Sequence, residues 1–130
     1  MYDKILLIER FRQIEEQIDI LIKGTEKVAD MNELPLSPEG VLQLNGICMS
    51  LFVIGEELKK IDQLTDKQLL IQYSNIPWRE VIGMRDIIAH HYFDVDIDIV
   101  SDILRMDIPP LQETIHQIII DLEHSRDRCS

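Results

Sequence analysis

The first thirty residues carry hydrophobic side chains in alternating steps of three and four, and polar residues fill the positions between them. This spacing is typical of a heptad seam, in which one stripe of an α-helix faces a partner helix. It predicts a long helix over about residues 2–29. The seam consists of Leu7, Phe11, Ile14, Ile18, Leu21, Thr25 and Val28.

A second long helix is predicted from Pro38 to about Ile61. Ser37 is suited to cap it, because serine supplies a hydroxyl oxygen at the N-cap and proline at the next position needs no N–H partner. Gly55 lowers the helix propensity by about 1 kcal/mol relative to alanine, and it is placed to let another backbone come close. The three-four spacing continues through Leu44, Ile47, Leu51, Ile54, Leu58 and Ile61.

The remaining sequence predicts shorter helices. Thr65 and Gln68 have the spacing of a capping box for one short helix. Pro77 is placed to open a helix over about residues 78–91, and Asp96 to cap a further helix that ends before Pro109. The last helix is expected over about residues 110–123. Because no segment shows strand alternation, the sequence predicts one all-α domain over residues 1–130, a bundle of two long antiparallel helices with shorter ones packed on them.

The amino-acid composition limits the kinds of function that the chain can have. The 130-residue chain has a net charge of −11 and only 5% aromatic residues, which disfavours general binding of polyanions. Any contact with nucleic acid must therefore use a small local basic site. Cys48 lies in an apolar helical run and Cys129 is the penultimate residue, a pattern that suits a reducing cytoplasm and no disulfide framework. The apolar run at residues 5–8 is too short for a signal peptide or a membrane span.

The stretch GMRDIIAHHYFDVD, residues 83–96, holds two of the four histidines. Arg85, His90 and Tyr92 fit the pattern R-x4-H-x-Y. At about 100° per residue, Tyr92 falls nearly under Arg85 on an ideal helix, whereas His90 falls about 140° away. One straight helix therefore does not bring all three together. Either the helix distorts or ends near His90, or a second copy of the motif in a symmetric dimer supplies the missing group.

These residue types suit the cleavage of phosphodiesters. Histidine moves protons near neutral pH, and arginine holds a phosphate and stabilises charge on its oxygens. RNA brings its own nucleophile, the 2′-hydroxyl, so the chemistry requires no metal or other cofactor. A metal site is the alternative, although neighbouring histidines on a helix point in different directions. Its ligands would be His90, His91, Asp94 and Asp96.

Three stretches resemble the HepT-like family of HEPN-domain proteins. They are LFVIGEELKKI (51–61), IPWREVIGMRDIIAHHYFDVDIDIV (76–100) and DIPPLQETI (107–115). The resemblance implies a small all-α protein that forms a homodimer, and many members are metal-independent endoribonuclease toxins whose R-x4-6-H motif lines a cleft at the dimer interface. It also implies a partner, an MNT-type nucleotidyltransferase antitoxin that transfers AMP to the tyrosine of the H-x-Y element.

The family roles are carried over position by position. The resemblance makes Arg85 the phosphate-binding arginine, His90 the catalytic histidine and Tyr92 the modification site. Asp86 stands where the family often has asparagine, and its charge would weaken anion binding unless it pairs with Arg85 or Arg79.

Two further residues are candidates for supporting roles. His91 is expected to face solvent. Glu56 either faces the same cleft or caps a packing contact. The leading hypothesis is a ribonuclease toxin of a toxin–antitoxin pair that acts on RNA in the cytoplasm. The alternative is a non-enzymatic dimeric helical module that binds nucleotide or a partner protein.

Overall fold

The computed structural model describes residues 3–90 and 96–125, and these residues form helices joined by short turns. No strand occurs in these two ranges, so the all-α prediction is confirmed. The elements in chain order are α1 (Lys4–Thr25), the 3₁₀ helix η1 (Met31–Leu36), α2 (Pro38–Leu64), the 3₁₀ turn η2 (Leu70–Gln72), α3 (Trp78–His90), α4 (Ile97–Asp102), the π-helical turn η3 (Ile103–Asp107) and α5 (Ile108–Ser125).

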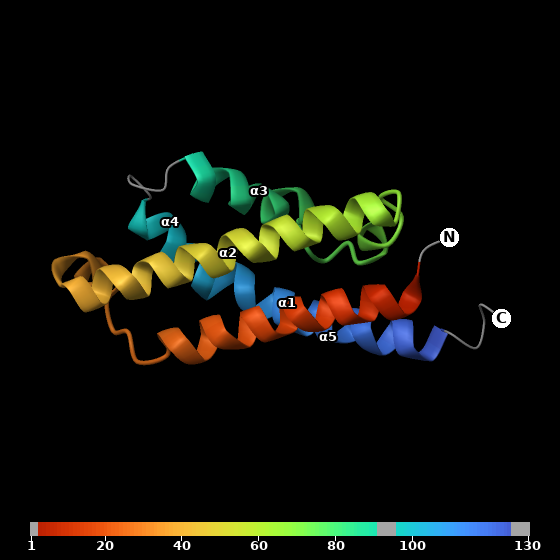
Figure 1. The fold of residues 1–130 in the computed structure, drawn as a ribbon, viewed down its shortest axis with the longest axis horizontal. Coiled ribbons are helices and arrows are strands. Elements are labelled where there is room, and N and C mark those ends of the chain that lie inside the picture. The colour runs from red at the N-terminus through yellow and green to blue at the C-terminus, as the bar shows by residue number, and fades with distance from the viewer. Residues whose placement is uncertain (1–2, 91–95, 126–130) are drawn as a thin grey trace.

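The two long helices α1 and α2 run antiparallel through the middle of the molecule (Figure 1). The short helix α3 packs against α2, on the side of α2 that faces away from α1, and α5 packs along α1. The start of α1 and the end of α5 lie at one end of the bundle, and the end of α3 lies towards the other (Figure 1). The candidate residues of α3 are therefore held on a surface supported by α2.

The predicted seam of α1 is part of the hydrophobic core. Its first five members are buried: Leu7, Phe11, Ile14, Ile18 and Leu21. The helix ends at Thr25, earlier than predicted. The chain tightens there, because the N–H of Val28 donates to the carbonyl oxygen of Thr25 three residues back. Asp30 then caps η1 by accepting from the N–H of Asn32.

The predicted seam of α2 also lies in the core, together with buried residues of α3 and α5. Ser37 caps the helix as predicted, since its Oγ accepts from the N–H of Gly40 at 3.0 Å, and Pro38 occupies the first turn. Gly40 is required where it stands, because a Cβ there would overlap the carbonyl oxygen of Leu34 in η1. The buried members of the seam are Ile47, Leu51, Ile54, Leu58 and Ile61, while Leu44 is half-buried.

The capping box predicted at residues 65–68 is wrong. Thr65 closes α2 instead of opening a new helix, and its Oγ1 donates to the carbonyl oxygen of Ile61 at 2.9 Å. Asp66 and Lys67 then adopt left-handed φ angles of 52° and 60°. A left-handed residue ends a right-handed helix. The N–H of Gln68 then donates to the carbonyl oxygen of Thr65 at 2.9 Å, which closes a turn and not the first turn of a new helix.

Helix α2 is also long and apolar enough to cross a membrane, judged only by length and by a mean hydropathy of 1.3 over its most apolar window. Among the described residues it is the one helix that passes this test. Its seam is buried by packing against α1 and α3, and a core helix of a bundle meets the same two conditions. This finding is weak evidence for a membrane span.

The C-terminal half begins as predicted and then departs from the prediction. Helix α3 starts after Pro77, and Asp96 caps α4 by accepting from the N–H of Asp98 at 2.9 Å. The helix that Asp96 caps was expected to stop before Pro109; α4 ends at Asp102, but the chain continues without a break through η3 into α5. Proline is tolerated in the first turn of a helix because its missing N–H needs no partner there. Helix α5 can therefore start at Ile108, before both prolines.

Candidate functional site

Helix α3 packs closely against α2 at Gly55. A Cβ on Gly55 would lie 3.2 Å from the Cβ and the backbone nitrogen of Arg85 and 3.2 Å from the carbonyl oxygen of Ile82. Two of these three atoms belong to the backbone of α3, so any side chain at position 55 would push this helix outwards. The prediction that Gly55 lets another backbone come close is confirmed, and the backbone it admits carries Arg85.

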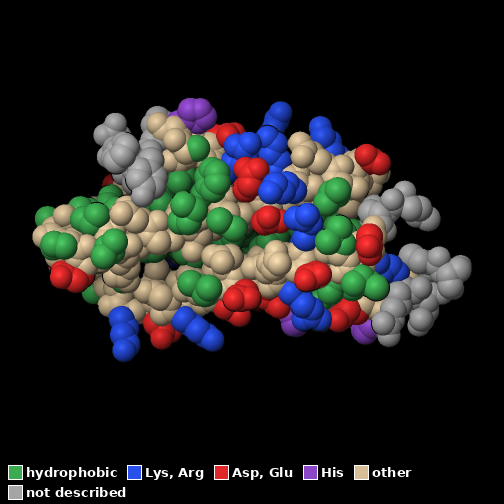
Figure 2. All heavy atoms as spheres, in the orientation of Figure 1, with side chains coloured by type: hydrophobic (Ala, Val, Ile, Leu, Met, Phe, Trp, Pro, Cys, Tyr) green, Lys and Arg blue, Asp and Glu red, His purple; other side chains and the backbone are tan. Residues whose placement is uncertain are grey.

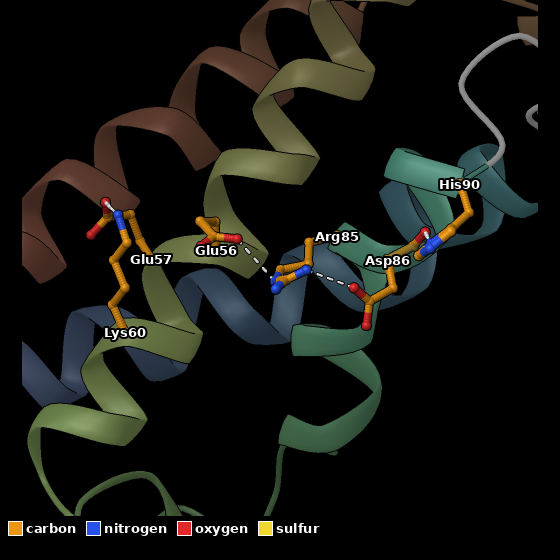
Figure 3. Close-up of polar contacts among 6 residues, drawn as sticks. All are labelled: Glu56, Glu57, Lys60, Arg85, Asp86 and His90. Carbon is orange, nitrogen blue, oxygen red and sulfur yellow. Dashed lines mark hydrogen bonds and ion pairs between the residues drawn. The ribbon is translucent and has the colours of Figure 1, made fainter.

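The guanidinium of Arg85 lies between two carboxylates, one from each helix. Its Nε is 2.9 Å from Oε1 of Glu56, and its Nη1 donates to Oδ1 of Asp86 at 2.6 Å. The Glu56 contact is an ion pair and not an aligned hydrogen bond, because the buried Nε–H does not point at the oxygen. Figure 3 shows both carboxylates directed at the same side chain.

The two carboxylates differ in exposure. The side chain of Glu56 is 31% exposed and that of Arg85 only 21%, whereas that of Asp86 is 60% exposed. Asp86 pairs with Arg85, one of the two arginines named above as its possible partners. Glu56 also faces this arginine.

His90 is oriented by the backbone of its own helix. Its Nδ1 lies 2.8 Å from the carbonyl oxygen of Asp86, one turn earlier. A carbonyl oxygen only accepts, so Nδ1 carries the proton in this contact. In the neutral imidazole Nε2 then holds a free lone pair on an exposed side chain. His90 is therefore prepared to accept a proton from a bound molecule.

Arg85 and His90 do not converge within one chain. Figure 3 shows Arg85 directed towards α2 and His90 at the end of α3, with Asp86 between them. Asp86 touches both, through its side chain to Arg85 and through its carbonyl oxygen to His90. This arrangement agrees with the angle of about 140° expected for residues five apart on a helix.

The neighbouring charges on α2 belong to a separate ion pair. Glu57 lies 2.9 Å from Nη1 of Arg10 in α1 and 4.0 Å from Nζ of Lys60. Glu56 and Glu57 therefore hold arginines on opposite sides of α2. Lysine and arginine side chains gather over the middle of α2 and α3, with acidic side chains among them (Figure 2). This surface carries charges of both signs on a chain whose net charge is −11.

A hydrophobic hollow lies between α2 and α3 beside His90. It is lined by Met49, Phe52, Ile88 and Ala89. Met49 is 55% exposed although it sits in the long central helix. This surface was not predicted from the sequence. The available signal was that Met49 and Phe52 are hydrophobic but lie off the heptad seam of α2.

Several predicted residues cannot be placed. His91 and Tyr92 lie outside the described residues, and so does Asp94 of the metal alternative. Within residues 3–90 and 96–125 no group of three or more His, Cys, Asp or Glu side chains could hold a metal ion. Asp96, the fourth ligand of that alternative, caps α4.

Burial raises the pKa of the Cys48 thiol, which keeps it in the unreactive form.

Comparison with known proteins shows which family the sequence matches. The family described as "Ribonuclease HepT-like" has a sequence model that matches residues 7–118, a range that includes α1 from Leu7 onwards and the whole of α2 and α3. No solved structure matches the chain.

Curated relatives from three organisms match parts of the chain. "Putative RNase MJ0125" of Methanocaldococcus jannaschii is 41% identical over 71 residues, which are 55% of this chain and 58% of the relative. "Putative RNase TTE0752" of Caldanaerobacter subterraneus is 34% identical over 54% of this chain and 59% of its own. "Probable ribonuclease HepT" of Thermococcus cleftensis is 38% identical over 51% and 56%. Each match thus spans little more than half of the relative's length.

Proposed function

Because the chain belongs to the HepT-like ribonuclease family, we propose that it is an endoribonuclease that cleaves RNA without a metal ion, with Arg85 and His90 carrying the reaction. The observation that supports this most directly is the orientation of His90, whose Nδ1–H is held by a carbonyl oxygen while Nε2 is left to accept a proton. The names of the three relatives support the same class of activity.

The proposed reaction is an internal transfer at phosphorus. Nε2 of His90 takes the proton from a 2′-hydroxyl, and the 2′-oxygen attacks the adjacent phosphorus. The P–O5′ bond breaks, and the 5′-oxygen leaves with a proton taken from a second acid or from water. The products are a 2′,3′-cyclic phosphate and a 5′-hydroxyl. Arg85 stabilises the negative charge that develops on the phosphate oxygens.

A substituted substrate tests this mechanism. The purified protein should cleave an RNA oligonucleotide in excess EDTA, and it should not cleave a matched oligonucleotide that carries 2′-O-methyl groups, because that substrate lacks the nucleophile. If EDTA stops the reaction and an added divalent ion restores it, the metal alternative at His90, His91, Asp94 and Asp96 replaces this proposal.

We further propose that the active species is a homodimer whose site takes Arg85 from one chain and His90 from the other. Two observations support this. The residues do not converge within one chain (Figure 3), and the hydrophobic hollow lined by Met49, Phe52, Ile88 and Ala89 lies beside His90. An exposed apolar surface of this kind is suited to a second copy of the chain.

Mixing two inactive variants tests the shared site. A dimer of one Arg85→Ala chain and one His90→Ala chain would keep one intact site, formed by the remaining Arg85 and the remaining His90. Co-refolding the two variants should therefore restore part of the wild-type rate, while each variant alone stays inactive. A mixture that remains inactive although the mixed dimer is shown to form would place both residues of each site in one chain.

Control of the activity is proposed from the family resemblance. In this proposal an MNT-type nucleotidyltransferase antitoxin transfers AMP to Tyr92, two residues after His90. The added phosphodiester is an anion that would compete with RNA for Arg85. The pair would act as a toxin and antitoxin in a reducing cytoplasm, and a buried free thiol at Cys48 is compatible with that compartment.

The alternative function is a non-enzymatic dimeric module that binds nucleotide or a partner protein. The observation that favours it is the double pairing of Arg85, since two carboxylates around one guanidinium oppose the binding of an anion. Induced expression separates the two functions. Growth arrest that a neighbouring nucleotidyltransferase gene relieves supports the toxin, and growth without arrest supports the module.

A further inference from the structure

The two carboxylates on Arg85 come from different helices and differ in their freedom to move. Glu56 stands on α2 next to Gly55, where an added Cβ would lie 3.2 Å from the backbone of α3, and its partner atom Nε is buried. Asp86 follows Arg85 on α3 and is 60% exposed. A side chain with that exposure can turn into solvent without moving a helix, whereas Glu56 is only 31% exposed and contacts a buried nitrogen of Arg85.

A bound phosphate would have to displace one of them. Arginine binds a phosphate best through two parallel N–H groups. With Glu56 on Nε, the pair formed by Nη1 and Nη2 remains for the phosphate, and Nη1 is the atom that Asp86 occupies. The positive charge of Arg85 is also outnumbered by the two carboxylates, so an incoming anion meets repulsion until Asp86 withdraws.

We propose that Glu56 is a positioning residue that aims the guanidinium of Arg85, and that Asp86 is a built-in competitor that the RNA phosphate displaces. This inference rests on the proposed function for its substrate. It assigns opposite effects to two carboxylates that touch the same side chain. Loss of Asp86 frees Nη1 for phosphate, and loss of Glu56 leaves Arg85 without the contact that aims it.

The direction in which RNA affinity changes when each carboxylate is removed separates this proposal from general electrostatics. Removing any negative charge from a chain with a net charge of −11 strengthens RNA binding slightly, wherever the charge lies. General electrostatics therefore predicts tighter binding for both Asp86→Asn and Glu56→Gln. The proposal predicts tighter binding for the first and weaker binding with slower cleavage for the second.

Matched controls exist on the same two helices. Glu57→Gln removes one charge from α2 at the next position, but its partner is Arg10 and not Arg85. Glu80→Gln removes one charge from α3, where the residue lies close enough to Asp107 to raise its pKa. Glu56→Asp keeps the charge and only shortens the side chain, so it tests reach without changing electrostatics. Thermal unfolding of each variant confirms that the compared proteins are folded.

The experiment measures binding and cleavage separately. The dissociation constant is measured by fluorescence anisotropy with a 2′-O-methyl RNA, and kcat and KM are measured with unmodified RNA at the same salt concentration. Asp86→Asn should bind about two- to fivefold more tightly than Glu80→Gln, the size expected for loss of one largely exposed ion-pair partner. That gain should vanish when Arg85 is also replaced by alanine.

Glu56→Gln and Glu56→Asp should bind about threefold more weakly than Glu57→Gln, and their kcat should fall about tenfold, part of the loss expected for removing a charge-stabilising donor outright. The proposal is overturned if Asp86→Asn binds no better than Glu80→Gln, or if its gain survives Arg85→Ala. It is overturned equally if both Glu56 variants match Glu57→Gln.

The binding results decide the inference even if the proposed function fails. A wild-type protein that binds the 2′-O-methyl RNA but leaves unmodified RNA intact would contradict the cleavage proposal. The order of the dissociation constants would still support or overturn the roles of Glu56 and Asp86. Absence of RNA binding in every variant, Asp86→Asn included, would overturn the inference as well.

Discussion

Nδ1 of His90 lies 2.8 Å from the carbonyl oxygen of Asp86, and this contact determines which imidazole nitrogen is free to react. The backbone of α3 thus prepares the histidine before any substrate arrives. The same residue, Asp86, holds the neighbouring guanidinium at 2.6 Å. One turn of helix therefore contacts both the proposed proton acceptor and the proposed phosphate-binding cation.

The tautomer of His90 is directly measurable. Long-range ¹H–¹⁵N NMR spectra should show His90 protonated on Nδ1 in its neutral form. His124 is the control, because its imidazole makes no hydrogen bond within the described part of the chain. Its tautomer should therefore follow the preference of free histidine in solution. A spectrum with His90 protonated on Nε2 would contradict the proposed orientation, because Nε2 could then not act as the base.

The packing at Gly55 predicts a contrast between two glycines of α2. Gly46→Ala should stabilise the protein by up to about 1 kcal/mol through helix propensity, because nothing lies within 4 Å of the added Cβ. Gly55→Ala should lose that gain and reduce RNA cleavage, because its Cβ would press on the backbone of α3 at 3.2 Å. Urea unfolding of both variants measures the difference. Equal stabilisation by both substitutions would show that α3 gives way freely at this point.

Asp107 should destabilise the fold at neutral pH. Burial, followed by repulsion from Glu80 and Asp102, raises its pKa above the usual 3.8. The folded state therefore binds the proton more tightly than the unfolded state does, and its stability falls as the pH rises through the raised pKa. Asp107→Asn should increase the free energy of unfolding at pH 7, and the gain should shrink towards the unfolded-state pKa as the pH falls.

Glu113→Gln is the control for Asp107→Asn, because it removes one exposed negative charge from α5. Chemical denaturation at several pH values should show a smaller and less pH-dependent change for this variant. A stability gain for Asp107→Asn that is the same at every pH would contradict the explanation through the raised pKa.

The proposed switch at Tyr92 predicts a mass change. Incubation with a cognate nucleotidyltransferase, ATP and magnesium should add one or more AMP groups, mapped to the peptide that contains Tyr92, and RNA cleavage should stop. Tyr92→Phe should block the addition and stay active. If Tyr92→Phe is modified to the same extent, the switch lies at another residue.

The heptad seams could be read from the sequence because burial on a helix repeats at a fixed spacing. Ile14 on α1 and Leu51 on α2 are both buried where that spacing placed them. The capping box at Thr65 failed because the same hydroxyl that caps a helix start can also donate to the last carbonyls of the preceding helix. Local sequence does not decide between these two bonds.

The candidate site was predicted in its residues but not in its contacts. The R-x4-H-x-Y pattern predicted Arg85 and His90 as site residues, and Gly55 predicted that another backbone comes close to its helix. The sequence could not show that Glu56 and Asp86 share one guanidinium, because this depends on the distance between α2 and α3. His91 and Tyr92 remain predictions, since they lie outside the described residues.

The central claim is that Arg85 and His90 carry ribonuclease activity, and a single-turnover cleavage assay on one RNA in excess EDTA tests it most directly. His90→Ala should slow cleavage by about 10²–10⁴-fold, and Arg85→Ala should slow it by about 10²–10³-fold. Both variants should keep their fold. His116→Ala removes a histidine that pairs with Glu15 on the far helices and should cleave at the wild-type rate. The account would be contradicted if the His90→Ala variant cleaved RNA at the wild-type rate, or if the wild-type protein left the RNA intact.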